Sequence, residues 1–229
     1  MVCGQWSVVS GQWSVVSGQW SVVSGQWSMK TISEKAKQNR DSPSPEDAGF
    51  SDASARVVWI TGLSGAGKST VGRLLAERLR ASGCPTVLLD GDEVRQAIAD
   101  AHVGHDRESR LTNAMRICRF AKLIAEQGLT VVAPTMSLFK EVYAWNRAHQ
   151  PNYFEALLQV RMQVLRDRDA RGLYSRAERG EAQHVVGVHA SYDEPDSPDL
   201  ILTNEGPVSE VHRLVDQIVA ALQTKARLP

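Results

Sequence analysis

The sequence has little cysteine, few aromatic residues and no excess of charge of either sign. Only three of the 229 residues are Cys, and Phe, Trp and Tyr together make up 6%. Cys3, Cys84 and Cys118 lie far apart without metal-type spacing, which argues against a disulfide scaffold or a zinc site. We expect reduced thiols in a cytoplasmic protein, with Cys118 in the core because it falls inside an apolar helical pattern.

The balanced charge excludes several classes of partner. Lys and Arg number 26, as do Asp and Glu, so the formal net charge is zero. Non-specific binding to nucleic acid or to a membrane surface is therefore not expected, and any basic site must be local. No apolar run approaches the roughly 20 residues that span a bilayer, and a basic segment followed by an apolar one, typical of a secretory signal, is not found.

Residues 1–28 consist mainly of an identical seven-residue repeat. GQWSVVS occurs three times from Gly4 to Ser24, and a fourth copy begins at Gly25. The glycine, serines and adjacent valines of each copy oppose a stable coiled coil, and three units are too few for a solenoid. We expect this segment to be non-native or disordered, as translated repetitive DNA upstream of a start at Met29. The alternative is an aggregation-prone or partner-binding Trp segment.

The rest of the chain divides into a linker and one domain. Residues 29–55 are rich in Lys, Glu, Asp, Ser and Pro, which predicts disorder. Residues 56–227 alternate apolar runs with helical patterns, which predicts an α/β fold with a five-stranded, mostly parallel sheet, helices on both faces and ligands at the carboxyl ends of the strands. The expected strands are Val57–Thr61, Thr86–Leu89, Leu129–Ala133, Tyr153–Val160 and Leu200–Leu202. The expected helices are Lys68–Ala81, Glu93–Ala99, Arg107–Gln127, Leu138–Ala148, Met162–Asp169 and Val208–Thr224.

The first expected strand leads into a phosphate-binding loop, the P-loop. The segment VVWITGLSGAGKST, residues 57–70, fits the pattern G-x-x-x-x-G-K-[ST] between a strand and a helix. Glycines allow backbone N–H groups to surround a polyphosphate, Lys68 reaches the outer phosphates, and Ser69 ligates Mg²⁺. The sequence therefore predicts a P-loop NTPase fold and a nucleoside triphosphate site made by Gly62, Leu63, Ser64, Gly65, Ala66, Gly67, Lys68, Ser69 and Thr70.

The segment LLDGDEVR follows the second expected strand and places Asp90, Asp92 and Arg95 near that loop. A carboxylate at a strand end can hold Mg²⁺ through water or accept the proton of an attacking hydroxyl, and Asp90 is the better placed. As an alternative, Asp90-Gly91 is a turn and Asp92 caps the next helix. The two roles are compatible for Asp92.

These motifs resemble those of the adenylylsulfate kinase family over Val57 to Asn204. The resemblance implies an ATP-dependent kinase with catalytic residues Lys68, Asp90 and Arg168, and with Ser69 and Asp90 at the metal. It implies an acceptor site made by Asp92, Arg95, Arg110, Asn113, Arg116, Ser137 and Lys140. Arg110, Asn113 and Arg116 spread over roughly 120° of one helix, so they can converge on one ligand.

The segment RDARGLYSRAERGE, residues 168–181, matches the family's mobile lid. A basic segment of this kind can fold over ATP, shield the phosphates and supply positive charge during transfer. The resemblance assigns contacts with ATP to Arg168 and Arg171. Tyr174 is either a further lid contact or a packing anchor.

The acceptor half departs from the family pattern at three places. The family has aromatic rings at the positions of His105 and Val185, which hold the acceptor's adenine, an arginine at Lys140 and an aspartate at His189. Valine cannot stack as a ring does, and lysine lacks the bidentate fork of arginine. The chain also resembles a branch of kinase-like proteins associated with surface-polysaccharide modification, one of which phosphorylates cytidine diphosphoramidate.

The leading hypothesis is transfer of the γ-phosphate of ATP, with Mg²⁺, to a ribose hydroxyl of a small nucleotide, nominally adenylylsulfate in sulfate assimilation. The alternative acceptor is a cytidine diphosphate derivative. A regulatory NTPase without a small acceptor is a different class, which the lid and the missing NKxD motif argue against. An inactive nucleotide-binding subunit is opposed by the intact Lys68, Ser69 and Asp90. A homodimer is usual for the family, and the sequence leaves the oligomeric state open.

Overall fold

The computed structural model describes residues 15–16, 19–20, 55–99, 104, 106–169, 172–183 and 185–226. The chain forms two units, Met1–Asp47 and Ala48–Pro229. The described residues of the first unit are two short antiparallel strands, β1 (Val15–Val16) and β2 (Gln19–Trp20). The rest of the repeats and the segment from 29 to 54 lie outside the described residues. The expected boundaries at residues 28 and 55 therefore stay predictions.

The second unit is built on a five-stranded sheet in which every neighbouring pair of strands is parallel, which confirms the predicted fold class. The order across the sheet is β4-β5-β3-β6-β7. The strands are β3 (Val57–Thr61), β4 (Thr86–Leu88), β5 (Thr130–Pro134), β6 (Phe154–Gln159) and β7 (Leu200–Thr203). Because all strands run the same way, their carboxyl ends meet at one edge, with the P-loop after the central strand.

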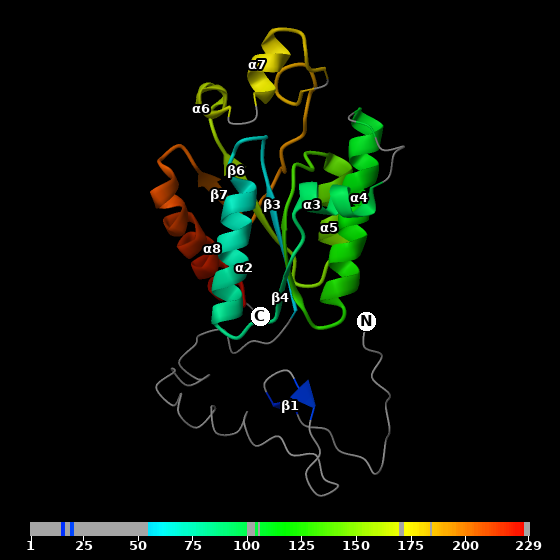
Figure 1. Cartoon of the computed structure of the whole chain (residues 1–229), viewed down its shortest axis with the longest axis vertical. Coiled ribbons are helices and arrows are strands. Elements are labelled where there is room, and N and C mark those ends of the chain that lie inside the picture. Colours follow the sequence, from blue (N-terminus) through cyan, green and yellow to red (C-terminus); the bar gives the residue numbers. More distant parts are fainter. Residues whose placement is uncertain are drawn as a thin grey trace, which may run out of the picture. The chain divides into compact units, whose positions relative to one another are not determined.

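Helices cover both faces of this sheet. Figure 1 shows α2 and α8 on one face, α4 and α5 on the other, and α6 and α7 beyond the carboxyl edge. The helices are α2 (Lys68–Ala81), α3 (Gly91–Ile98), α4 (Arg107–Ala125), α5 (Lys140–His149), α6 (Met162–Arg168), α7 (Leu173–Glu178), the 3-10 turn η1 (Val208–Glu210) and α8 (Val211–Ala226). Within the part of the chain that is described, none is long and apolar enough to cross a membrane.

The two faces of the sheet bury separate hydrophobic clusters, because successive residues of a strand point to opposite sides. In β3, Val58 and Ile60 belong to the cluster that contains α2 and α8. Val57 and Trp59 belong to the cluster that contains α4 and α5. All four side chains are fully buried, so the continuous apolar run of β3 follows from helices packing on both of its faces.

The two described cysteines are free thiols. Cys118 is buried in the cluster under α4, as predicted, and burial raises the pKa of its thiol to about 12. A thiol of that pKa has almost no thiolate at neutral pH and is not a nucleophile. Cys84 is half-buried and donates to the Thr130 hydroxyl. Both residues have a structural role.

Three helices differ from the predicted ones in where they begin or in whether they were expected at all. α3 begins at Gly91, two residues early, because the Asp90 carboxylate caps its first turn. α5 begins at Lys140, two residues late, because the preceding residue keeps an extended backbone. α7 was not expected as a helix. Its first turn is supported by Asp169, whose carboxylate accepts hydrogen bonds from two of its N–H groups.

A charge network ties α8 and α5 to the amino-terminal ends of β6 and β7. Lys225 of α8 donates to the Tyr153 carbonyl at 2.7 Å and to Asp199 at 2.6 Å. Arg147 of α5 bridges Asp199 at 2.9 Å and Glu155 at 3.3 Å, and the Tyr153 hydroxyl donates to Glu155 at 2.7 Å. The network lies at the edge of the sheet away from the P-loop, so it supports the fold without touching the cavity described below.

The two carboxylates of this network respond differently to burial. Burial raises the pKa of Glu155, although hydrogen bonds from Tyr153 and Arg147 oppose it. Burial also acts to raise the pKa of Asp199, but the hydrogen bonds from Lys225 and the Glu155 N–H outweigh it, and the pKa falls below its ordinary value. Because the folded-state pKa of Asp199 is the lower one, its contribution to stability is complete above the unfolded-state pKa of about 4 and is lost as the pH falls further, through the folded-state pKa.

Replacing Lys225 with Met should lower the thermal midpoint at pH 7, because it leaves a partly buried carboxylate and a carbonyl without a charged donor. A loss of about 1–3 kcal/mol corresponds to about 3 °C or more for a domain of this size. Lys122→Met is the matched control, since Lys122 forms an ion pair with exposed Glu126 at the end of α4, and such surface pairs contribute little. Equal midpoints for the two variants in a calorimetric scan would contradict the structural role of the network.

Candidate active site

A cavity of about 630 Å³ opens at the carboxyl ends of the strands, where the P-loop, α3, α4, the lid and the turn after β7 meet. The predicted site residues that line it are Ser64, Gly65, Gly67, Lys68, Ser69, Thr70, Asp90, Asp92, Arg95, Arg110, Asn113, Ser137 and Arg168. Those described but not among its lining residues are Gly62, Leu63, Ala66, Arg116 and Lys140. Arg171, and His105 at the expected stacking position, lie outside the described residues.

Glycines fix the shape of the P-loop. Gly62, Gly65 and Gly67 have φ values of 145°, 78° and 93°, a region that L side chains rarely adopt. A Cβ on Gly62 would collide with the Leu158 carbonyl of β6, and a Cβ on Gly67 would lie 2.5 Å from the Asn204 amide nitrogen. The loop leads directly into α2, so the N–H groups at the start of that helix stand at the cavity, where they favour an anion.

Lys68 and Ser69, the first two residues of α2, both line the cavity. The Lys68 ammonium donates to the Leu63 carbonyl at 2.7 Å, which keeps the long side chain folded over the loop. Such a flexible ammonium can exchange a backbone acceptor for a phosphate oxygen. The geometry therefore agrees with a lysine that reaches phosphates held by the loop.

Asp90 lies at the end of β4, 5% exposed, and lines the cavity. Its Oδ1 accepts a hydrogen bond from the Asp92 N–H at 3.0 Å, so Asp90 itself is the cap of α3. The alternative in which Asp92 is the capping residue is therefore wrong. A carboxylate accepts several hydrogen bonds, so a cap can also face a reacting hydroxyl.

α3 and α4 add cationic and amide groups to the cavity. Arg95 donates to the Gly104 carbonyl at 3.2 Å, and Arg110 and Asn113 come from successive turns of α4. Burial lowers the pKa of Arg110, although the nearby Asp106 carboxylate opposes this. The guanidinium stays charged at neutral pH. Two cations and an amide suit an anionic nucleotide.

Two predicted acceptor residues, Arg116 and Lys140, are not among the lining residues. Arg116 comes six residues after Arg110. It therefore lies about 120° around α4 from Arg110 and roughly 9 Å further along the helix axis. Lys140 is an exposed residue at the start of α5, and its N–H donates to the Asp193 carboxylate at 3.4 Å. Neither residue is among those that line the cavity.

Two polar cavity residues at strand ends were not predicted from the sequence. Thr135 directly follows β5, and its buried hydroxyl lies 2.8 Å from that of Ser137. A Cβ on Gly91 would lie 2.9 Å from the Thr135 hydroxyl, so the end of β5 packs against the start of α3. Asn204 directly follows β7, and its amide donates to the Ala66 carbonyl at 2.8 Å. Both residues follow predicted strands at their carboxyl ends, and this position in the sequence could have indicated that they line the site.

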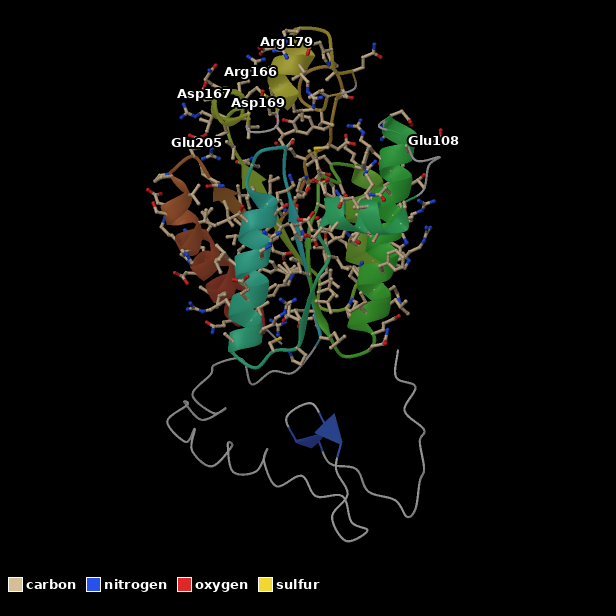
Figure 2. The ribbon with its side chains drawn as sticks, viewed as in Figure 1. Glu108, Arg166, Asp167, Asp169, Arg179 and Glu205 are labelled. Carbon is tan, nitrogen blue, oxygen red and sulfur yellow. The ribbon has the colours of Figure 1, made fainter. Side chains whose placement is uncertain are left out.

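The lid is anchored to the P-loop by Tyr174. This side chain is buried, and its hydroxyl donates to the Ser64 carbonyl at 2.8 Å. Asp169 accepts hydrogen bonds from Ser175 and from the Tyr174 N–H, which lower its pKa to about 2. Figure 2 shows Asp169 and Arg179 at the end of the domain where α6 and α7 lie. Tyr174 is thus a packing anchor, one of the two roles that the sequence left open.

Arg168 ends α6 and lines the cavity, while two of its N–H groups are directed at backbone carbonyls. Nη1 donates to the Asn204 carbonyl at 2.8 Å and Nη2 to the Gly206 carbonyl at 2.9 Å. The guanidinium therefore braces the turn after β7. A fork with five N–H donors can hold this turn and still contact a ligand.

Val185, the second expected stacking position, belongs to the hydrophobic core. It is 5% exposed and packs in the cluster of α2 and α8. Its carbonyl accepts hydrogen bonds from the N–H groups of Val188, His189 and Ala190, which fold the segment into a tight turn. The structure therefore corrects the expectation of a ligand-facing position here. The side chain of His189 is exposed.

The family model of adenylylsulfate kinase matches residues 54–203. The chain is 38% identical to an adenylyl-sulfate kinase of Chloroflexus aurantiacus over 170 residues, which cover 74% of this chain and 90% of that protein. It is also 38% identical to a cytidine diphosphoramidate kinase of Campylobacter jejuni over 148 residues, which cover 65% of this chain and 85% of that protein.

The fold is similar to that of solved kinases. An APS kinase of Mycobacterium tuberculosis, solved in complex with AMPPNP and APS, superposes with a TM-score of 0.68 at 32% identity. The superposition covers 74% of this chain and 98% of that one. Residues 54–203, which the family model matches, include the P-loop and the elements that line the cavity up to β7.

Replacing Val185 with Phe should destabilise the domain, because a ring does not fit a site that is already packed. Overpacking of this kind costs about 1–3 kcal/mol, or several degrees in thermal midpoint. Val208→Phe is the matched control, since Val208 is 79% exposed. A Val185→Phe midpoint equal to or above that of the unaltered protein would show that the ring finds space outside the core.

Proposed function

Because the chain belongs to the adenylylsulfate kinase family, we propose that this ATP-dependent phosphotransferase moves the γ-phosphate of ATP to a ribose hydroxyl of a small nucleotide. The leading acceptor is adenylylsulfate, and the product is then 3′-phosphoadenylylsulfate. One observation carries the proposal: a single cavity holds the P-loop lysine, the Asp90 carboxylate and the cationic groups of α3 and α4. Such a constellation serves a transfer between two bound nucleotides and is not needed by a regulatory NTPase.

Each group has a proposed role that follows from its chemistry. The P-loop N–H groups and Lys68 bind and orient the phosphates of ATP. Asp90 accepts the proton of the attacking hydroxyl, since it lies at a strand end beside the loop. Arg95, Arg110 and Asn113 hold the anionic acceptor, and Arg168 adds positive charge at the lid side.

Mg²⁺ fits the donor set of the cavity. Among the described residues no group of three or more His, Cys, Asp or Glu could hold a metal ion. Mg²⁺ needs only one or two protein oxygens, because phosphates and water supply its other ligands. The Ser69 hydroxyl and the Asp90 carboxylate both line the cavity and are the proposed ligands. When bound, the ion would neutralise charge on the phosphates.

A cytidine diphosphate derivative such as cytidine diphosphoramidate is the second candidate acceptor. Among the described lining residues Tyr174 is the only aromatic, and its hydroxyl is committed to the P-loop. Val185 offers no ring, and Lys140 stands away from the cavity. Of the two positions at which the family has rings that hold adenine, Val185 carries none, which supports an acceptor with a different base. A cytoplasmic homodimer acting in sulfate assimilation stays the expectation for the leading acceptor.

A product assay separates the two acceptors. Purified protein with Mg²⁺ and ATP is given adenylylsulfate, cytidine diphosphoramidate or cytidine diphosphate, and kcat/KM is measured for each by coupled ADP release. A tenfold preference corresponds to about 1.4 kcal/mol of differential binding in the transition state, which sets the scale for a specific acceptor. Transfer to none of the three acceptors by protein that binds ATP would overturn the proposed function.

Lys68→Ala and Asp90→Asn should each lower kcat by at least about 100-fold, because each removes a charge or base that acts in the transition state. Asn is as good a helix cap as Asp, so Asp90→Asn should keep α3 and the thermal midpoint intact. Asp216→Asn on the outer face of α8 is the control for a neutralised carboxylate. Near-normal turnover of either site variant with the best acceptor would remove that residue from the mechanism.

A further inference from the structure

The turn that follows β7, residues 204–206, joins the P-loop to the base of the lid. Asn204 is 7% exposed, and its amide Nδ2 donates to the Ala66 carbonyl at 2.8 Å. Only the NH₂ half of an amide can serve a carbonyl acceptor, so this bond also fixes the orientation of the side chain. The two residues are 138 positions apart in the sequence. The bond therefore links the last strand to the loop after the central one.

Asn204 and the P-loop are packed without spare room. A Cβ on Gly67 would lie 2.5 Å from the Asn204 amide nitrogen, and Gly67 adopts a φ of 93°. The Asn204 N–H donates to the Gln159 carbonyl at 3.2 Å, which holds its backbone against the end of β6. The amide is thus supported from the sheet and fills the place that a side chain at Gly67 would take.

The same turn is held at three points by arginines at the two ends of α6. Arg168 donates to the carbonyls of Asn204 and Gly206, at 2.8 and 2.9 Å. Arg161 forms an ion pair with Glu205 at 2.7 Å. Figure 2 shows Glu205 at the same end of the domain as Asp167 of α6. A displacement of α6 is therefore transmitted to Asn204 and to the P-loop.

We propose that Asn204 is a positioning residue for phosphoryl transfer, which holds the P-loop in the shape that binds the triphosphate. Its side chain fixes Ala66 and Gly67, and its carbonyl couples the loop to Arg168. It acts through these residues rather than on the reacting atoms. The inference rests on the proposed assignment of the P-loop as the ATP phosphate site and adds a residue from outside that motif.

Asn204→Asp and Asn204→Ala test this proposal against Thr203→Ala, the exposed neighbour on β7. Aspartate keeps the shape of the side chain but presents an oxygen to the Ala66 carbonyl and cannot donate when ionised. We expect both variants to raise the ATP Kd and the KM for ATP at least about tenfold, as for the loss of one buried hydrogen bond at a binding site. The KM for the acceptor should change by less than about twofold, because the Asn204 amide contacts the P-loop, which is the proposed ATP phosphate site. Thr203→Ala should change neither constant.

The split between the two KM values separates positioning from general stability. A residue that only stabilised the fold would lower the thermal midpoint and the fraction of active protein, and would leave the ATP KM of the folded enzyme unchanged. An unchanged ATP Kd in either folded variant overturns the proposal, as does a failure of both variants to fold. The ATP Kd is measured by calorimetry without an acceptor. Wild-type protein that binds ATP but phosphorylates no tested acceptor would therefore count against the proposed function and leave this test intact.

Discussion

The active-site end of the domain depends on one steric constraint, which is that the P-loop lies against the ends of β6 and β7 with no room for side chains at Gly62 and Gly67. The Leu158 carbonyl occupies the place of one Cβ and the Asn204 amide approaches that of the other. This close approach sets where α2 begins, and hence where the helix N–H groups, Lys68 and Ser69 stand. A loop displaced outward would lose the anion-binding geometry even with all of its residues present.

The lid and the P-loop share their supports. Tyr174 reaches the Ser64 carbonyl, and Arg168 braces the turn that holds Ala66 through Asn204. Phosphoryl transfer needs groups held in place and water kept out, because little of its catalysis comes from covalent chemistry of the protein. These contacts hold the P-loop and the base of the lid in a fixed relation to each other, which helps to keep the reacting groups in place. Arg168 therefore contributes positive charge to the cavity and also holds the turn after β7 through its hydrogen bonds.

The ATP side and the acceptor side of the cavity follow the pattern of the family to different degrees. The P-loop and Asp90, which any acceptor needs, keep the pattern of the family. Two positions on the acceptor side depart from that pattern, and the structure places Val185 in the core and Lys140 on the surface. Discrimination between nucleotides depends on rings and on paired hydrogen bonds, so these departures bear on the identity of the acceptor and not on the proposed phosphoryl transfer itself.

The sequence by itself determined the parallel sheet, the P-loop and most helices, because apolar periodicity and a contiguous phosphate motif are local properties of the chain. It also placed Cys118 in the core and Asp90 at a strand end. Only the tertiary structure decided that Asp90 caps α3, that Arg110 but not Arg116 lines the cavity, and that Asn204 holds the P-loop. Ala66 and Asn204 are 138 residues apart, and no pattern along one sequence reports which strand ends will touch. Such contacts arise when packing of the two hydrophobic clusters fixes the order of the strands, and they exist only in the folded chain.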